Sequence, residues 1–329
     1  MRLWDIYHKD VPPFLSTLAQ TPEMKRLEAV GMNCGCEYTS FPRFRNLGAY
    51  SRYDHSMGVA LIIWRFTGDP VQSVAGLFHD IATPVFAHVV DFLRGDHLRQ
   101  EATEEGTEGI LRASPAINAL LRPWGITPEQ VSDYHRFPIA DNDTPLLSAD
   151  RLEYTLGNLV NFGFSSREEV RSYYEDLTVC PNEDGVPELT FQTESTAFSF
   201  AEKAMLCAAI YVSPEDRYAM QMLSELLGRA MKRSVIEEKD LLTTEEAVIR
   251  KLTAQEDTAR EWKRFCSYSS MLTASFPGPE PDWRQIRAKK RYIDPLIKGK
   301  GRASALSAGF SQALSSFLSQ DFEEWLRGI

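Results

Sequence analysis

The segment Leu77-Phe-His-Asp-Ile81 joins a histidine directly to an aspartate at the end of a mostly apolar run. A single histidine, His55, precedes this doublet by 24 residues, and a single aspartate, Asp150, follows it by 70. Two imidazoles and two carboxylates can ligate one divalent transition metal. Each residue alone would also suit a helix cap or a buried polar contact. Burying both groups of the doublet unpaired would cost several kcal/mol, which favours a site.

The pattern of apolar residues and helix-start signals around these segments predicts a mainly α fold. Thr21-Pro22, Asp69-Pro70 and Thr83-Pro84 each place a cap before a proline. Helices are expected at 11–31, 54–67, 70–80, 85–94, 98–113, 114–123, 127–135, 145–163, 195–212, 214–232, 243–253, 254–268 and, weakly, 304–319.

A small β component is expected in the second half of the chain. Segments 177–180 and 187–192 flank a turn-rich stretch and predict a hairpin. The basic segment 287–297 predicts a strand, and 322–326 predicts a packed turn. We expect a core domain at 1–232 and a C-terminal extension at 233–329 packed on it. By composition, the Pro- and Gly-rich breaker at 276–281 is the best candidate boundary.

Composition narrows the class of protein. The net charge of −10 disfavours nonspecific nucleic-acid binding, which depends on cationic surface. No run reaches the roughly 18 apolar residues of a membrane helix, and the N-terminus has no apolar signal core. A cytoplasmic protein with five reduced cysteines and no membrane partner is therefore expected.

The pattern of a histidine, a His-Asp doublet and a distant aspartate resembles the HD-domain superfamily of metal-dependent phosphohydrolases. Pro22-Glu-Met-Lys-Arg-Leu27, Arg52-Tyr-Asp-His-Ser-Met-Gly-Val59 and Pro84-Val-Phe-Ala-His88 further resemble its deoxynucleoside triphosphate triphosphohydrolase branch. The likeness covers about residues 1–230. It implies an HD-domain helical bundle with a small β-hairpin and a C-terminal α(+β) extension.

The resemblance also implies residue roles at the reaction centre. His88 would act on the reacting phosphate. Asp91 would orient His88 and favour its charged form. Glu104 would be a further catalytic residue. One divalent metal (Mn, Fe, Ni or Zn) is implied, with Mg as a possible companion of the substrate. The implied metal ligands are His55, His79, Asp80 and Asp150.

Substrate-binding residues are implied in the same way. Arg52 would contact phosphate, and Arg151 stands where the family usually has a lysine. Its planar guanidinium suits phosphate. Tyr154 matches a tyrosine that packs near the sugar. Arg45 and Arg217 are further candidates for binding a triphosphate.

The chain departs from the family pattern at several positions. Thr83 and Thr103 stand where the family has histidines. Met32-Asn33 replaces a Gln-Leu pair under the sugar, and Asn158 replaces an aspartate that reads a sugar hydroxyl. Metal binding and phosphoester cleavage are compatible with these changes, whereas triphosphate cleavage and deoxy-selectivity do not follow from them.

Several functions therefore stay open. The first is a metal-dependent nucleotide phosphohydrolase, either converting a deoxynucleoside triphosphate to nucleoside and triphosphate or acting as a nucleotide monophosphatase. The second is a metal- and nucleotide-binding regulatory module with little turnover, and the third is a nonenzymatic helical scaffold. A homo-oligomer is expected from the resemblance. The basic run Arg287-Ala-Lys-Lys-Arg291 is either an effector site or, as we expect, a solvated cationic strand.

Overall fold

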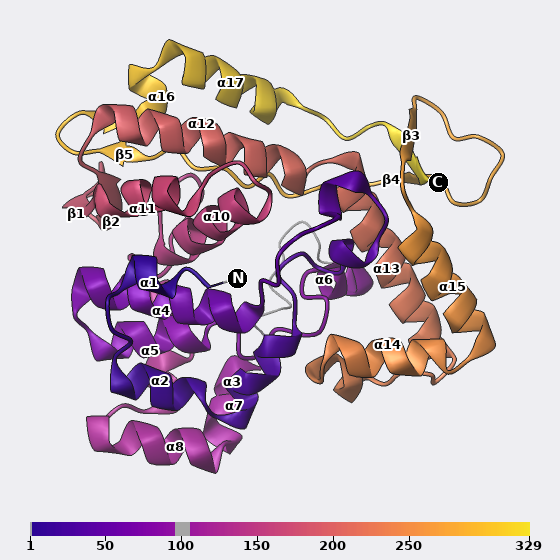
Figure 1. Cartoon of the computed structure of the whole chain (residues 1–329), viewed down its shortest axis with the longest axis horizontal. Helices are drawn as coiled ribbons and strands as arrows, with labels where there is room; N and C mark the ends of the chain where they lie inside the picture. The colour runs from indigo at the N-terminus through magenta and orange to yellow at the C-terminus, as the bar shows by residue number, and fades with distance from the viewer. Residues whose placement is uncertain (1, 96–105) are drawn as a thin grey trace.

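A computed structural model describes residues 2–95 and 106–329, and helices make up most of it. This confirms the mainly α fold class. In the first half of the chain, α4 packs against α1, α2, α3 and α5 (Figure 1). The helices of this half are α1 (Trp4–Tyr7), α2 (Pro13–Ala19), α3 (Pro22–Arg26), α4 (Arg52–Thr67), α5 (Pro70–Phe78), α6 (Val89–Arg94), α7 (Thr107–Ala113), α8 (Pro115–Leu121) and α9 (Pro128–Val131).

The second half of the chain adds longer helices. Helix α12 packs on α10, α11 and α17, and α13 packs on α6 and α15. The helices of this half are α10 (Ala149–Asn161), α11 (Arg167–Glu175), α12 (Glu194–Tyr211), α13 (Pro214–Lys232), α14 (Glu245–Thr253), α15 (Glu256–Ser267), α16 (Ala303–Leu306) and α17 (Ala308–Ser319).

Helices α4 and α5 form a tight pair, close to the ranges expected at 54–67 and 70–80. Ser51 caps α4 by accepting a hydrogen bond from the Asp54 amide, and Gly68 ends it with a φ of 62°. Asp69 caps α5, and Pro70 occupies its first position. Because only residues 68 and 69 separate the two helices, α5 folds back along α4. The end of α5 therefore lies beside the beginning of α4.

Helix α10 approaches α4 closely at Gly58. A Cβ at Gly58 would lie 2.6 Å from Cγ of Glu153 on α10, so any larger residue would collide with it. Ser148 starts α10 by accepting a hydrogen bond from the Arg151 amide. This close approach places the first turn of α10, with Asp150, next to the first turn of α4.

Two small sheets join distant parts of the chain. Strands β1 (Leu177–Pro181) and β2 (Pro187–Phe191) pair antiparallel, which confirms the predicted hairpin. Strand β5 (Leu296–Ile297) extends this sheet in parallel with β2, and β6 (Gly301–Arg302) follows it. In the second sheet, β7 (Trp325–Gly328) lies between β3 (Met271–Ala274) and β4 (Arg284–Gln285). The C-terminal segments are thus hydrogen-bonded into the rest of the fold.

Some local predictions were wrong. The helix expected at 85–94 begins only at Val89, because Phe86 and Ala87 adopt φ values of 59° and 46°, outside the helical region. Of the strand expected at 287–297, only Leu296–Ile297 pairs with a neighbour. The turn expected at 322–326 overlaps strand β7. Helix α11 was not predicted; its apolar positions are few and it is rich in charge.

The largest cluster of buried hydrophobic side chains contains residues from Leu3 to Leu326, on both sides of the expected boundary at 232/233. The division into domains 1–232 and 233–329 stays a prediction. Among the described residues, no helix has the length and apolar character needed to cross a membrane.

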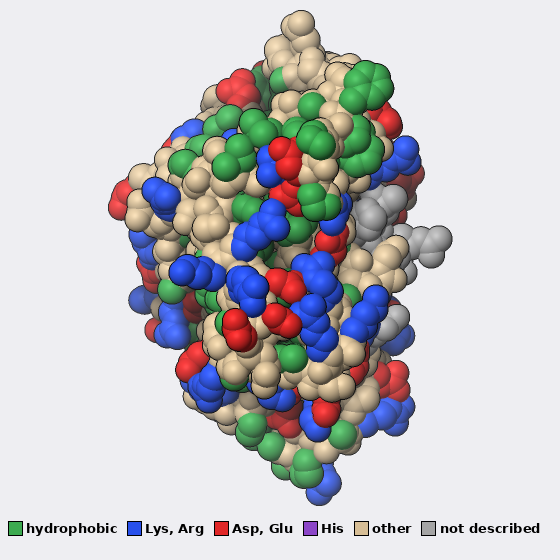
Figure 2. All heavy atoms as spheres, turned by 90° about the vertical axis from the view of Figure 1, so that its right-hand side faces the viewer, with side chains coloured by type: hydrophobic (Ala, Val, Ile, Leu, Met, Phe, Trp, Pro, Cys, Tyr) green, Lys and Arg blue, Asp and Glu red, His purple; other side chains and the backbone are tan. Residues whose placement is uncertain are grey.

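Acidic and basic side chains share one face of the molecule. Figure 2 shows this face, which includes α13 and α15, with Lys and Arg side chains interspersed among Asp and Glu. Ion pairs such as Arg229–Glu261 and Arg284–Glu225 join the elements there. The opposite charges within each of these pairs largely cancel at a distance.

Candidate metal centre

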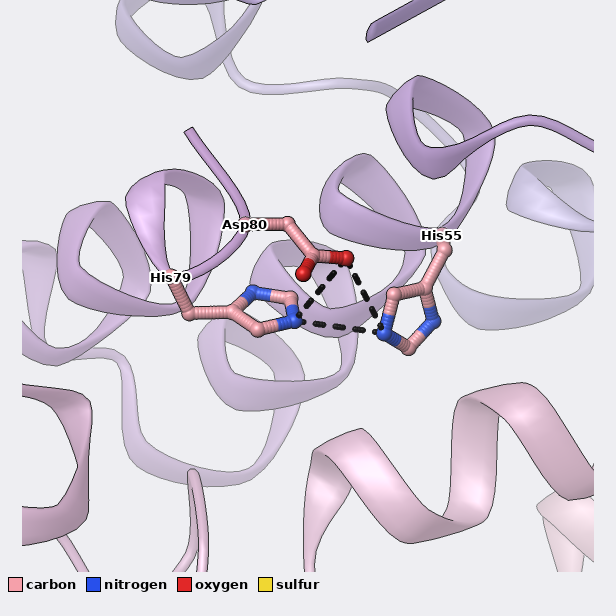
Figure 3. A group of neighbouring side chains, drawn as sticks. All are labelled: His55, His79 and Asp80. Atoms are coloured by element: carbon pink, nitrogen blue, oxygen red, sulfur yellow. Dashed lines mark hydrogen bonds and ion pairs between the residues drawn. The ribbon is translucent and has the colours of Figure 1, made fainter. Parts of the chain in front are cut away.

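His55, His79 and Asp80 point toward one another in the core of the molecule (Figure 3). His55 lies in the first turn of α4, and the doublet directly follows α5. The two Nε2 atoms are 3.2 Å apart. Oδ2 of Asp80 lies 3.6 Å from Nε2 of His79 and 4.0 Å from that of His55. All three residues are buried.

Asp150 adds a second carboxylate to this group from the first turn of α10. Its Oδ1 lies 2.9 Å from Nε2 of His55 and 3.8 Å from Nε2 of His79. In an octahedral site with metal–ligand distances of about 2.1 Å, neighbouring ligand atoms are about 3.0 Å apart and opposite ones about 4.2 Å. The separations among His55, His79 and Asp80 fall within this range, so these three side chains fit one divalent cation, and Asp150 lies beside them at 2.9 Å from His55.

The electrostatics of the cluster also favour a cation. Burial would lower the pKa of His55, but its hydrogen bonds with Asp150 and Glu153 raise it to about 10. Burial would raise the pKa of Asp80, but Arg52 and the two imidazoles hold it well below its usual range. The carboxylates of Asp80, Asp150 and Glu153 thus lie close together with one guanidinium, that of Arg52, and a metal would neutralise this concentration of negative charge.

Glu153 stands behind His55 and was not singled out from the sequence. Its Oε2 lies 2.6 Å from Nδ1 of His55, and its carboxylate also accepts hydrogen bonds from the hydroxyls of Tyr50 and Tyr7. A carboxylate at Nδ1 fixes the proton there, so that the Nε2 lone pair faces the cluster. The sequence feature that could have identified Glu153 is its position three residues after Asp150, because this spacing puts both side chains on one face of α10.

Arg52 and Thr83 hold the other carboxylate. Nη1 of Arg52 lies 3.0 Å and 3.3 Å from the two oxygens of Asp80. The Thr83 hydroxyl donates to Oδ1 of Asp80 at 2.6 Å. Thr83, which replaces a family histidine, therefore orients a ligand candidate instead of offering an imidazole. Asp80 is left with Oδ2 toward the two histidines.

His88 and Asp91 form a second polar pair beside the cluster. Nδ1 of His88 lies 2.8 Å from Oδ2 of Asp91, which is fully buried. Burial, the nearby Arg291 and Arg52 lower the pKa of His88 to about 4, although Asp91 opposes the shift. The imidazole is therefore neutral at pH 7. With the ring's proton held at Nδ1 by Asp91, its Nε2 atom can accept a further proton.

A single cavity of about 240 Å³ contains most of the predicted site. Tyr154 and Tyr211 stand edge to face in its wall, and Asn158 donates to the Tyr211 hydroxyl at 2.7 Å. Oδ1 of Asn158 is buried and accepts no hydrogen bond from the described residues. The predicted residues that line the cavity are Asn33, Arg52, His55, His79, Asp80, His88, Asp150, Arg151, Tyr154 and Asn158.

Some predicted residues are hydrogen-bonded by the protein itself, and others do not line the cavity. Arg151 donates to the backbone carbonyls of Asn142 and Leu146 and to the Asn142 side chain, so it holds the loop that precedes α10. Arg217 is buried and hydrogen-bonded within the core, and Arg45 does not line the cavity. Glu104 and Thr103 lie outside the described residues. The roles assigned to individual site residues stay predictions.

Charged residues that were not among the predicted site residues also line the cavity, among them Lys289, Arg291 and Asp216. Lys289 and Arg291 come from the basic run that was expected to be a solvated strand. Asp216, in the first turn of α13, has its pKa raised to about 7 by burial, with the Cys36 thiol close by. These groups reach the cavity from segments far away in the sequence from the metal-ligand candidates.

The chain is similar in sequence to two known proteins. No family model matches the chain. It is 27% identical over 254 residues to the uncharacterized protein YdhJ of Bacillus subtilis, covering 75% of this chain and 74% of YdhJ. It is also 27% identical over 188 residues to the metal-dependent phosphohydrolase cns2 of Cordyceps militaris, covering 54% of this chain and half of cns2.

The fold is also similar to that of a solved structure. The crystal structure of a phosphohydrolase from Bacteroides thetaiotaomicron matches this chain with a TM-score of 0.66 at 14% identity, over 97% of this chain and 96% of that one. The two proteins therefore share a fold along nearly their whole length. The chain is thus similar in sequence to a metal-dependent phosphohydrolase and in fold to a phosphohydrolase, and its His55, His79 and Asp80 form a group that could hold a divalent metal.

Proposed function

We propose that this protein is a metal-dependent phosphohydrolase that acts on a nucleotide. The observation that carries the proposal is the group formed by His55, His79 and Asp80 in the wall of a cavity, with Oδ1 of Asp150 2.9 Å and 3.8 Å from the Nε2 atoms of the two histidines. The likeness to cns2 supports the reaction class. The family resemblance of the segments around the cluster supports the nucleotide.

The four side chains would hold one divalent metal through the two Nε2 atoms and a carboxylate oxygen of each aspartate. A metal bound there supplies a water of lowered pKa and polarises a phosphoryl oxygen. Glu153 would keep His55 in the tautomer that presents Nε2, and Arg52 and Thr83 would keep Asp80 aligned. The chain itself would thus contribute metal ligands whose orientation is fixed by hydrogen bonds.

His88 would handle a proton at its Nε2 atom. The neutral imidazole accepts a hydrogen bond or a proton there, while Asp91 holds the ring by its Nδ1–H. A phosphate anion bound beside Nε2 would raise the pKa of His88 from about 4. His88 could then take up a proton in the complex and give it to the departing oxygen.

The substrate side of the cavity suits a sugar. The aromatic face of Tyr154 can pack on a sugar ring, and Oδ1 of Asn158 can accept a hydrogen bond from a sugar hydroxyl. Asn33 lies in the same cavity wall. In the finer form of the proposal, the substrate is a deoxynucleoside triphosphate and the products are nucleoside and triphosphate. A nucleotide monophosphate would release phosphate instead.

A regulatory module with little turnover is a second candidate function. Thr83 replaces a family histidine, and Arg151 uses its guanidinium to hold a loop. Both observations favour a pocket that binds metal and nucleotide but lacks some of the side chains that the resembling enzymes use for hydrolysis. Measured turnover separates the two functions.

Two variants test the proposal directly. Purified protein with Mn, Fe, Ni, Zn or Mg would be screened against nucleoside mono-, di- and triphosphates, with release of phosphate and triphosphate measured separately. We expect Asp80→Ala to lose both bound metal and turnover, and His88→Ala to lose turnover while keeping the metal. Asp257→Ala, on the exposed surface of α15, is the matched control and should behave like the wild type. Retained turnover in Asp80→Ala would contradict the proposal.

A further inference from the structure

The guanidinium of Arg26 binds three backbone carbonyls from distant parts of the chain. Arg26 is the last residue of α3, in the segment 22–27 that the proposed function leaves without a role. Its Nη2 atom donates to the carbonyl of Ile81 at 3.0 Å and to that of Thr83 at 2.7 Å. Its Nη1 atom donates to the carbonyl of Thr243 at 3.4 Å. One side chain thus joins α3 to the turn that follows α5 and to the segment that precedes α14.

The turn that Arg26 holds, residues 79–83, carries Asp80. The amide of Thr83 donates to the carbonyl of Asp80 at 2.9 Å, and the Thr83 hydroxyl donates to Oδ1 of Asp80 at 2.6 Å. Thr83 is therefore bonded both to the backbone and to the carboxylate of Asp80. Because Arg26 holds the carbonyl of Thr83, it fixes the residue that orients this carboxylate.

The two histidines of the cluster are oriented by other elements. Nδ1 of His79 lies 2.7 Å from the carbonyl oxygen of Gly76, within α5 itself. Nδ1 of His55 lies 2.6 Å from Oε2 of Glu153 on α10. Of the three side chains that point toward one another, Asp80 is therefore the one whose orientation depends most on the turn after α5.

The carbonyls that Nη2 of Arg26 binds belong to buried residues between α5 and α6. Ile81 and Thr83 are both buried, and neither lies in a helix or a strand. A buried carbonyl without a hydrogen bond costs free energy, so these two groups need a donor. Burial lowers the pKa of Arg26 to about 10, and the nearby Asp80 carboxylate opposes this shift. The guanidinium therefore keeps its charge and its donors at pH 7.

The segment before α14 supports the same region from the other side. The carbonyl of Leu241 accepts a hydrogen bond from the amide of Val85 at 2.8 Å. Thr243, two residues later, is the third partner of Arg26. The stretch of chain that follows the His-Asp doublet is thus held both by α3 and by a segment beyond residue 232.

We infer that Arg26 is a positioning residue of the metal centre, which keeps the turn 79–83 in the shape that directs Asp80 toward the two histidines. Arg26 is not among the described residues that line the cavity, so it would act on the metal through this turn. The inference rests on the proposed function only in taking the cluster to hold a metal. It gives the segment 22–27 a role and makes no assumption about the substrate.

Metal affinity of the full-length protein tests the inference without any hydrolysis. The protein would compete with a chromogenic chelator for Mn or Zn. Arg26→Met keeps an unbranched side chain but removes every donor. We expect its metal Kd to rise by roughly tenfold or more, as is usual when a group that orients a metal ligand is lost. Arg26→Lys should recover part of the affinity, because its ammonium group can still donate to these carbonyls.

Arg284→Met is the matched control. Arg284 also donates to two backbone carbonyls, those of Pro281 at 2.7 Å and Trp283 at 2.9 Å, but it belongs to β4 and shares no partner with the turn 79–83. Its metal Kd should stay within about twofold of the wild type, because distant sites without shared partners act independently. The visible absorption spectrum of bound Co, which reports the arrangement of the ligands, should change in both Arg26 variants but not in Arg284→Met.

Each outcome decides a separate point. A folded Arg26→Met protein with the metal Kd and the Co spectrum of the wild type would overturn the inference, as would an equal loss of affinity in Arg284→Met. If Arg26→Met does not fold, Arg26→Lys decides by the same two measurements. If metal binding depends on Arg26 but the wild type hydrolyses no nucleotide, the proposed function fails and the role of Arg26 stands. If the wild type hydrolyses nucleotides and the Arg26 variants bind metal normally, the role of Arg26 alone is rejected.

Discussion

Replacing Glu153 with glutamine tests whether the carboxylate behind His55 supports metal binding. The side chain is 2% exposed, and its Oε2 lies 2.6 Å from Nδ1 of His55. Glutamine keeps the size, and its amide oxygen can still accept the Nδ1 proton, so the change removes mainly the negative charge. We expect the metal Kd to rise by roughly 10-fold to 100-fold, a loss of about 1.4–2.7 kcal/mol. The retained hydrogen bond places the expected value toward the lower end.

The assay is a competition between the protein and a chromogenic chelator for Mn or Zn, with the metal content checked by elemental analysis. Glu169→Gln is the matched control. Its carboxylate also accepts a hydrogen bond from a tyrosine hydroxyl, Tyr173 at 2.7 Å, but it belongs to α11 and contacts Lys203 instead of a histidine. A folded Glu153→Gln protein that binds metal as tightly as the wild type would refute the reasoning.

Three further predictions concern other parts of the site. The pKa of His88, followed by NMR, should be about 4, and it should rise in Arg291→Ala because a nearby cation is removed. Since this pKa lies below the unfolded value of 6.5, protonation favours unfolding, and stability should fall between about pH 6.5 and pH 4. Asp216→Asn should stabilise the protein at pH 8, by up to about 4 kcal/mol, but not at pH 4, because burial raises the pKa of the carboxyl from 3.8 to about 7. Gly58→Ala should destabilise the protein by roughly 1–3 kcal/mol in urea unfolding and weaken metal binding, because its methyl group would collide with Glu153.

Each of these has a clear contrary result. An unperturbed His88 pKa near 6.5 would mean that the imidazole is solvated and distant from Arg291. An Asp216→Asn variant whose stability relative to the wild type is the same at pH 4 and pH 8 would show that the carboxyl is not held protonated. A Gly58→Ala protein with unchanged stability and unchanged metal affinity would show that α4 and α10 can separate without loss.

Local signals in the sequence were enough for the elements that carry the cluster. Asp69-Pro70 and Ser148 mark helix starts, because a side-chain oxygen there satisfies amides that have no partner within the helix. The His-Asp doublet at the end of an apolar helix indicated a buried polar site. The segment Val85–His88 shows the limit of such signals: its apolar residues suggest a helix, but Phe86 and Ala87 adopt left-handed backbone conformations in the folded chain.

The residue types of the metal site, the helices that carry them and the mainly α class were thus determined by the sequence alone. The side-chain contacts that surround these residues were decided only by the tertiary structure. Glu153 meets His55 across 98 residues of chain, and Arg291 meets His88 across 203. Tertiary packing also decides that Arg151 binds the backbone of the loop before α10. It places Lys289 and Arg291, two of the four basic residues of the run 287–291, in the cavity wall. Caps and periodicity act over a few residues, whereas contacts between distant side chains depend on how close two helices can pack, here at Gly58, and on where the ends of an irregular segment are fixed.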